Sequence, residues 1–210
     1  MEHAARPSSG NPMRIFLKPR AARVAAAAGL AALLLAAGAH AVEFNQLQPG
    51  TSAVTFAYRQ MNVPMDGRFQ RFSGRIHFDP AKPALAQAEI AIELASIDTG
   101  SPEGNDEVVG KLWFNTKQFP VARFVSSSIR PLGNNRFEVT GKMSIKGRTH
   151  DVTTPATFRQ AGPQGVFEGS FVLKRADYGL GEGMWADFGT VANDVQIKFR
   201  LVAAAAAGKK

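Results

Sequence analysis

The stretch that decides the fold is NRFEVTGKMSIKGRTHDVTTPATF, residues 135–158. In its first half, apolar or very small side chains alternate with polar ones, and the apolar phase holds Phe137, Val139, Gly141, Met143 and Ile145. A period of two over this length is typical of a strand with one buried and one solvent-facing side. Lys146-Gly147 supplies a turn, because glycine accepts positive φ without steric cost. The alternation then resumes from Val152 to Phe158, so the stretch predicts a β-hairpin.

The same alternation recurs on both sides of this hairpin. It marks six further strands, at 51–58, 72–78, 90–94, 122–129, 166–174 and 195–201. Residues 62–67, which include Pro64 and Gly67, break the pattern. After Leu94 the alternation stops, and Asn105 or Asp106 is expected to cap a short helix that places Val108, Val109, Leu112 and Trp113 on one side. Eight strands with short connections and one helix favour an all-β fold, either an antiparallel barrel or a sandwich.

The first 41 residues are predicted to be a signal peptide that is removed. Basic residues between Arg14 and Arg23 precede a short Ala/Leu-rich run, and Ala39-His40-Ala41 supplies a small-x-small cleavage site. A transmembrane anchor is the alternative, but the run is shorter than the roughly 20 residues that span a bilayer. We therefore expect a periplasmic protein whose domain covers 42–205, followed by a frayed tail at 206–210.

Removing this segment changes the charge of the chain. Residues 1–41 hold five of the 25 Lys and Arg residues and one of the 17 Asp and Glu residues, so the remainder carries 20 basic and 16 acidic side chains, a net charge of +4. Nucleic-acid binding, which a strongly basic chain would suggest, loses its main support. The chain has no cysteine. Disulfides, thiolate metal sites and cysteine nucleophiles are therefore excluded.

Residues suited to catalysis or metal binding are few. His77 and His150 both fall in the polar phase of a strand, and we expect both to face solvent. No Gly-x-Ser-x-Gly, His-Glu-x-x-His or phosphate-binding glycine loop is present. Acidic residues cluster at 98–107, where a Ca²⁺ site is an alternative, but the loop lacks the ligand spacing of an EF-hand. A solvated helix start is favoured there. We expect no catalytic residue, no metal and no cofactor.

The phenylalanines carry more information, because nearly all fifteen lie in the apolar phase of a strand. An eight-stranded barrel has an interior that side chains can just fill or that can hold one small ligand. The alternation alone leaves open whether the interior is packed or hollow.

Four short motifs, in order along the chain, resemble the YceI-like lipid- and polyisoprenoid-binding proteins. They are GRFxxFxGxI at 67–76, FPxxxF at 119–124, GKMSIKG at 141–147 and RxDYG at 175–179. The similarity runs from about Phe44 to Val202. It implies a lipocalin-like eight-stranded antiparallel barrel with one short helix and an internal tunnel for a polyisoprenoid, quinone tail or lipid chain. Many members read Arg-Asp-x-His-Leu where this chain reads Asn105-Asp106-Glu107-Val108-Val109, which leaves the head-group contact open.

On this reading the protein is a non-enzymatic carrier of one long apolar amphiphile. The residues expected to line the tunnel are Val54, Phe56, Tyr58, Phe72, Ile76, Ile90, Ile92, Leu94, Phe124, Val139, Met143, Phe171, Trp185 and Ile197. Arg175 and Asp177 are expected to form a structural pair at a strand end, with a ligand contact as the alternative. A transient contact with a membrane or membrane protein and a homodimer are left open. The competing functions are a ligand-free interaction or stress-response module, whose barrel would be filled, and a hydrolase, which would need inward polar groups.

Overall fold

The structure is a computed structural model that describes residues 42–206. The predicted signal peptide at 1–41 and residues 207–210 of the predicted tail lie outside them. The described chain forms eleven strands and one α-helix, α1 (Pro102–Val108). The strands are β1 (Phe44–Leu47), β2 (Ala53–Gln60), β3 (Val63–Phe69), β4 (Phe72–His77), β5 (Gln87–Glu93), β6 (Ile97–Asp98), β7 (Val121–Gly133), β8 (Arg136–Ile145), β9 (Arg148–Ala161), β10 (Gln164–Lys174) and β11 (Asp194–Ala205). Between residues 42 and 206, no helix has the length and apolar character to cross a membrane.

The predicted hairpin is confirmed. Strands β8 and β9 pair antiparallel from Ile145 opposite Arg148 to Arg136 opposite Thr157. Lys146 and Gly147 form the two-residue turn, with φ of 48° and 77°. Positive φ at both central residues is the geometry whose twist matches that of the flanking strands. Along β8 the apolar phase faces inward, as the alternation predicts, because Phe137 and Ile145 are buried whereas Arg136 and Lys142 are exposed.

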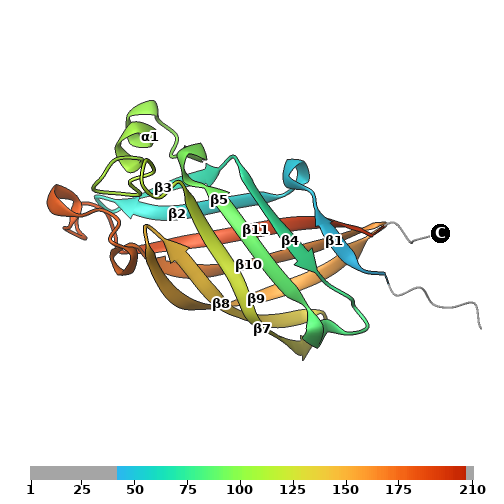
Figure 1. Ribbon diagram of the computed structural model, residues 1–210. Helices are drawn as coiled ribbons and strands as arrows, with labels where there is room; N and C mark the ends of the chain where they lie inside the picture. The colour runs from blue at the N-terminus through green and yellow to red at the C-terminus, as the bar shows by residue number, and fades with distance from the viewer. Residues whose placement is uncertain (1–41, 207–210) are drawn as a thin grey trace, which may run out of the picture. The chain divides into compact units, whose positions relative to one another are not determined.

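All pairings in the sheet are antiparallel, and the order of strands is β4-β5-β7-β8-β9-β10-β11-β2-β3-β6, with β1 beside β11. Only Gln70 and Arg71 separate β3 from β4. Strand β4 at one end of this order and β3, next to its other end, therefore form one continuous segment, whose first part pairs with β2 and whose second part pairs with β5. The sheet curls round on itself, as Figure 1 shows, with α1 at one end of the strands and β1 at the other. The predicted barrel-like, all-β fold with one short helix is confirmed.

All eight predicted strands are present, but β1, β3 and β6 were not predicted. The pattern-breaking residues at 62–67 belong largely to β3. Pro64 is tolerated in the strand because β6 covers β3 only at Arg68 and Phe69, so the earlier part of β3 is an edge on that side. Gly67 is needed because a Cβ there would collide with the Phe56 ring of the paired strand. Neither Pro64 nor Gly67 therefore marks the end of a strand here.

Helix α1 begins earlier than the sequence suggested. Its cap is Ser101, whose hydroxyl accepts a hydrogen bond from the Gly104 N–H at 3.0 Å, and Pro102 follows at the first helical position. The prediction of Asn105 or Asp106 as the cap is therefore wrong. Asn105 instead lies inside the helix and accepts hydrogen bonds from Thr99, through both the backbone N–H at 2.7 Å and the hydroxyl at 2.9 Å. These bonds hold the helix against the end of β6.

Candidate ligand-binding site

The interior of the curled sheet is hollow. A cavity of about 880 Å³ lies inside it, at the upper end of the range for small-molecule sites. Its wall is built from the inward phase of the long strands, for example Phe137, Val139, Met143 and Ile145 of β8. The alternation of each strand therefore does two things, because it gives the sheet a solvent-facing side and gives the cavity an apolar wall.

Thirteen of the fourteen residues predicted to line a tunnel border this cavity. They are Val54, Phe56, Tyr58, Ile76, Ile90, Ile92, Leu94, Phe124, Val139, Met143, Phe171, Trp185 and Ile197. Phe72 does not border it and instead packs against the buried cluster that contains Phe44, Phe78 and Phe158. That these side chains contact a ligand stays a prediction.

Two apolar clusters divide the interior along its length. One surrounds Phe78, whose ring lies 4.6 Å from that of Phe158 and 5.1 Å from that of Phe167 between ring centres. The other contains Phe56, Leu94 and Ile145, beside α1 and the segment that follows β10. Ile92, Phe69 and Ile197 pack against both clusters, so they lie midway along the cavity. A ligand chain running from one end to the other would pass Ile92.

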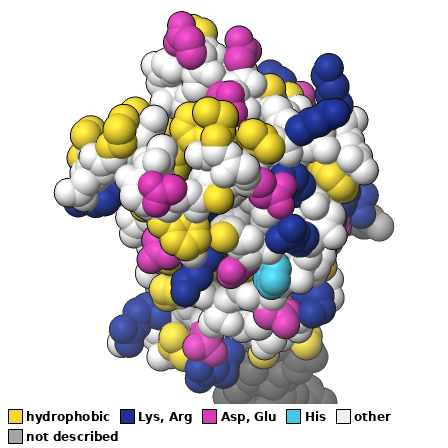
Figure 2. Space-filling model, turned by 90° about the vertical axis from the view of Figure 1, so that its left-hand side faces the viewer, with side chains coloured by type: hydrophobic (Ala, Val, Ile, Leu, Met, Phe, Trp, Pro, Cys, Tyr) yellow, Lys and Arg dark blue, Asp and Glu magenta, His cyan; other side chains and the backbone are white. Residues whose placement is uncertain are grey.

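The cavity meets solvent beside α1, at a set of lining residues that we call the mouth. On one side are Pro64, Met65 and Asp66 of the β3 edge, and on the other are Thr99, Gly100, Ser101, Glu103, Gly104 and Glu107. Most of them are exposed although they border the cavity. Figure 2 views this end of the molecule, where hydrophobic side chains gather beside several acidic ones. Sequence reasoning missed the mouth, because its residues come from a strand edge, a loop and one helical turn without a shared period.

Arg175 is the one buried charged side chain of the described core, with 1% of its surface exposed. Its guanidinium donates to five backbone carbonyls of the segment that follows it, at 2.7–3.3 Å, namely those of Leu180, Gly181, Trp185, Val191 and Ala192. It also lies 5.4 Å above the Trp113 ring and 5.2 Å from that of Phe188. Loss of hydration lowers the pKa of Arg175, and the nearby charge of Asp187 partly offsets this.

The expected pair of Arg175 and Asp177 is therefore wrong. Both residues lie in the same short turn, the 3-10 helix at Arg175–Tyr178, but Asp177 is exposed while Arg175 points inward. Close approach of the guanidinium also explains Gly181, where a Cβ would collide with Nη1 of Arg175. Arg175 thus has a structural role, but its partners are backbone carbonyls and not the carboxylate of Asp177.

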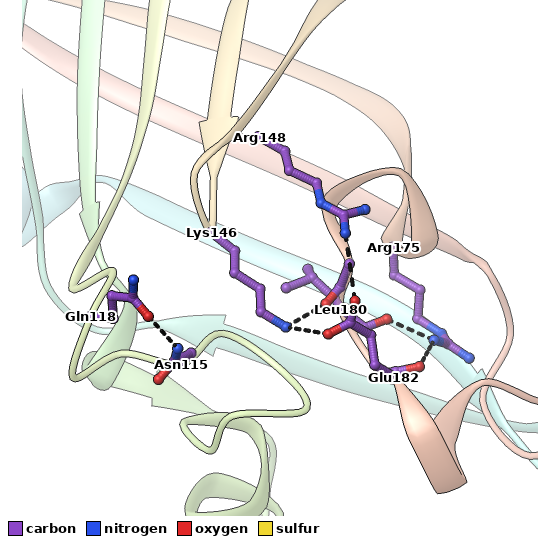
Figure 3. A network of polar contacts seen from close by, with 9 residues as sticks. Asn115, Gln118, Lys146, Arg148, Arg175, Leu180 and Glu182 are labelled. Atoms are coloured by element: carbon purple, nitrogen blue, oxygen red, sulfur yellow. Dashed lines mark hydrogen bonds and ion pairs between the residues drawn. The ribbon is translucent and has the colours of Figure 1, made fainter.

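The tip of the β8–β9 hairpin holds the same segment from outside. Lys146 Nζ donates to the Gly179 carbonyl at 2.6 Å and lies 3.1 Å from a Glu182 carboxylate oxygen. Arg148 lies 3.5 Å from the other oxygen of Glu182. Figure 3 shows these contacts beside those of Arg175. The segment from 179 to 192, which carries Trp185 of the cavity wall, is therefore fixed by Arg175 and by this hairpin.

Two polar side chains of the wall, Thr154 and Tyr58, are accounted for by a hydrogen-bond partner or a raised pKa. Thr154 Oγ1 donates to the carbonyls of Pro155 and Ser170, each at 3.1 Å. Burial raises the pKa of the Tyr58 hydroxyl, so Tyr58 stays neutral across the physiological range. Burial raises the pKa of Tyr178, which packs behind the wall, to about 12.

The two histidines do not converge, since His77 borders the cavity and His150 does not. His77 and His150 are both exposed, the former 3.0 Å from Glu43 and the latter 3.1 Å from the Asp177 carbonyl oxygen. Among residues 42–206, no three His, Cys, Asp or Glu side chains are grouped closely enough to hold a metal ion. Of the acidic loop, Asp98 pairs with Arg68 at 3.1 Å. Glu107 accepts a hydrogen bond from Trp185 Nε1 at 2.7 Å.

Comparison with known proteins agrees with this architecture. The model of the YceI-like domain matches residues 46–203. A UPF0312 protein of Azotobacter vinelandii is 30% identical over 137 residues, which cover 62% of this chain and 69% of the relative. A UPF0312 protein of Pseudomonas putida is 28% identical over 182 residues, or 82% of this chain and 94% of the relative.

Two solved structures share the fold. The crystal structure of BcnA from Burkholderia cenocepacia is 45% identical, covers 76% of this chain and all of its own, and superposes with a TM-score of 0.74. A polyisoprenoid binding domain from Saccharophagus degradans is 20% identical, with a TM-score of 0.63 over 79% of this chain and 99% of that domain. Because the family model spans most of the described residues, this chain belongs to the YceI-like domain family.

Proposed function

We propose that this member of the YceI-like family is a periplasmic carrier that holds one long apolar amphiphile, such as a polyisoprenoid, a quinone or a lipid chain, in its cavity. The observation that carries the proposal is the cavity of about 880 Å³ with a mainly apolar wall along the barrel. Each methylene that such a wall removes from water contributes roughly 0.8 kcal/mol, so a long chain can bind without a charged partner. The polyisoprenoid binding domain among the solved relatives supports the same class of ligand.

Two features favour a carrier over the competing functions. A ligand-free interaction module would fill its barrel with side chains, whereas about 880 Å³ stays open here. A hydrolase would need polar groups that converge on a substrate, whereas Thr154 and Arg175 of the wall are used in hydrogen bonds to backbone carbonyls. Shape and hydrophobicity, instead of a catalytic group, would then select the ligand.

Removing the ligand should lower the melting temperature. Protein refolded after organic extraction should melt lower than the protein as purified from its own host, because a ligand that binds only the folded state stabilises it by RT ln(1 + [L]/Kd). Adding a long-chain prenol or quinone should restore the melting temperature, and a short-chain prenol should restore less of it. Native mass spectrometry of the extracted and unextracted protein gives the bound mass. Extraction that releases nothing, together with no response to any prenyl compound, would favour the interaction module.

Blocking the middle of the cavity should discriminate between ligands by length. Ile92→Trp places an indole at the point where both apolar clusters meet. It should weaken a long prenol on the order of tenfold, since several buried carbons are displaced, and a short prenol much less. Val125→Trp is the matched control, because Val125 lies on the outer side of β7 and is 44% exposed. Equal loss for long and short prenols would contradict a ligand that runs along the cavity.

Export predicts a defined N-terminus. Cleavage after Ala41 should give a mature protein that begins Val-Glu-Phe-Asn at Val42. N-terminal sequencing of the periplasmic fraction checks this, with the membrane fraction as the comparison. An intact leader recovered in the membrane fraction would instead support the alternative of a transmembrane anchor.

A further inference from the structure

We propose that the mouth of the cavity accepts a ligand head group that donates hydrogen bonds and carries no negative charge, such as a hydroxyl or an ammonium, and that it disfavours a phosphate. This inference rests on the proposed function and adds the chemistry of the ligand's polar end. It follows from the charged side chains at the cavity and from the hydrogen bonds that these side chains already make within the protein.

The mouth is placed to hold a head group. The β3 edge at 63–67 has no neighbouring strand on its side toward α1, because β6 pairs only with Arg68 and Phe69. The wall of the cavity therefore changes at this point from apolar strands to an edge and a helix that are open to solvent. An amphiphile buried in the cavity would leave its polar end here, where it can keep contact with water.

Three carboxylates line the mouth, those of Asp66, Glu103 and Glu107. Among residues 42–206, none of them takes part in an ion pair. One oxygen of Glu107 accepts the hydrogen bond from Trp185, which leaves its other oxygen for a ligand. An ionised carboxylate can only accept hydrogen bonds. The mouth therefore offers acceptors and negative charge to whatever enters it.

No free Arg or Lys side chain balances these carboxylates within the described lining. Arg175 is the one Arg or Lys side chain that borders the cavity. A guanidinium has five N–H donors, and those of Arg175 are already directed at the carbonyls of Leu180, Gly181, Trp185, Val191 and Ala192. A phosphate at the mouth would thus meet like charges and lose hydration without gaining a donor from Arg175.

An independent observation favours a head group that also has an acceptor. The indole Nε1 of Trp113 is buried and has no hydrogen-bond partner within the described chain, although Trp113 borders the cavity near Arg175. A buried donor without a partner is unfavourable. This nitrogen is shielded from the empty cavity, so the Trp113 ring would have to move slightly before the oxygen of a hydroxyl could accept its hydrogen bond while donating its own hydrogen to a carboxylate. An alcohol therefore matches both features of this end of the cavity.

The experiment compares three C20 prenyl ligands that differ only in the head group: the alcohol, the primary amine and the monophosphate. Both tryptophans of the chain, Trp113 and Trp185, border the cavity, so intrinsic fluorescence reports binding without a label. At low salt the alcohol and the amine should each bind on the order of tenfold more tightly than the phosphate. Raising the salt concentration should reduce the difference between the amine and the phosphate.

Neutralising the mouth should remove this preference. The triple variant Asp66→Asn, Glu103→Gln and Glu107→Gln should bring the phosphate to within about threefold of the alcohol, because the like charges are gone. Gln at 107 keeps an oxygen that can accept from Trp185. The matched control carries the same three types of change at Glu138, Asp151 and Glu168, all outside the cavity wall. The control should keep the order of affinities that the parent protein shows for the three ligands. Because the two variants have the same net charge, a difference between them comes from the position of the carboxylates.

Each outcome bears on a different claim. Tighter binding of the alcohol and amine, lost in the mouth variant and kept in the control, supports the inference. If the alcohol binds but the phosphate binds equally well or better, the inference is overturned while the carrier function stands. Loss of the preference in both variants would assign it to net charge and would also overturn the inference. If the phosphate alone binds, the inference is again overturned and the carrier function stands, whereas the proposed function itself fails if none of the three ligands binds.

Discussion

Replacing Arg175 by methionine is expected to lower the free energy of unfolding by about 3–5 kcal/mol. Methionine occupies a similar space but has no N–H donors, so five backbone carbonyls, from Leu180 to Ala192, lose the donor that they share. A buried acceptor without a partner costs roughly 1–3 kcal/mol. Because some of these carbonyls can become hydrated as the segment loosens, the total should stay well below the sum of five such costs.

The measurement is a urea titration followed by far-UV circular dichroism. Lys174→Met is the matched control, because Lys174 precedes Arg175 and is exposed. It should change the free energy of unfolding by no more than about 0.5 kcal/mol. Arg175→Lys should fall between the two, since an ammonium keeps the charge but not the planar set of donors. A loss below 1 kcal/mol in Arg175→Met would mean that the carbonyls find other donors and that Arg175 does not organise the segment.

The strands could be predicted from the sequence because each one obeys a single local rule. In β8 the phase of Phe137 and Val139 decides which side faces the cavity, and the β9 partner strand is fixed by the turn at Lys146 and Gly147. The inward phase of β8 and of β10 also places Ile145, Phe167 and Leu173 on the cavity wall. Following the alternation to the end of each strand would therefore have added them to the predicted lining. The alternation that predicts the strands therefore also predicts which of their residues form the wall of the cavity.

The mouth and the Arg175 contacts could not be predicted in this way. Backbone carbonyls are the partners of Arg175, and every residue has one, so the sequence carries no mark of which carbonyls approach it. Asp177 is the conspicuous charged neighbour in the sequence, yet it is exposed. Likewise Asp66 and Glu107 lie 41 positions apart and meet at the mouth only because β3 has a free edge beside α1.

Closure of the sheet also depends on interactions beyond local pattern. Pro64 and Gly67 read as breaks in the sequence, but the strand they belong to continues through β4 and joins the two ends of the sheet. The Phe56 ring occupies the space that a Gly67 side chain would need. Packing across strands therefore decides that this segment is extended, and a window along one strand does not contain that information.

The second large effect should come from a charge placed inside the cavity. Val139→Lys is expected to lower the free energy of unfolding by several kcal/mol, about 2–4. Val139 borders the cavity, opposite Thr154 of β9 and Ile129 of β7, so an ammonium there has lost its hydration and has an apolar wall around it. The same change should also abolish the response of the melting temperature to added prenol, because the lysine occupies the path of the chain.

Two controls separate this effect from the chemistry of lysine itself. Val172→Lys makes the same substitution on the outer side of β10, where Val172 is 58% exposed, and should change stability by about 0.5 kcal/mol or less. Glu138→Lys, next to Val139 but in the solvent-facing phase, should do the same, since its contact with Arg130 at 2.8 Å is an exposed ion pair of small value. Urea titrations of the three variants, each with and without prenol, give the comparison. Equal losses at 138 and 139 would contradict the inward register of β8, and with it the assignment of the wall.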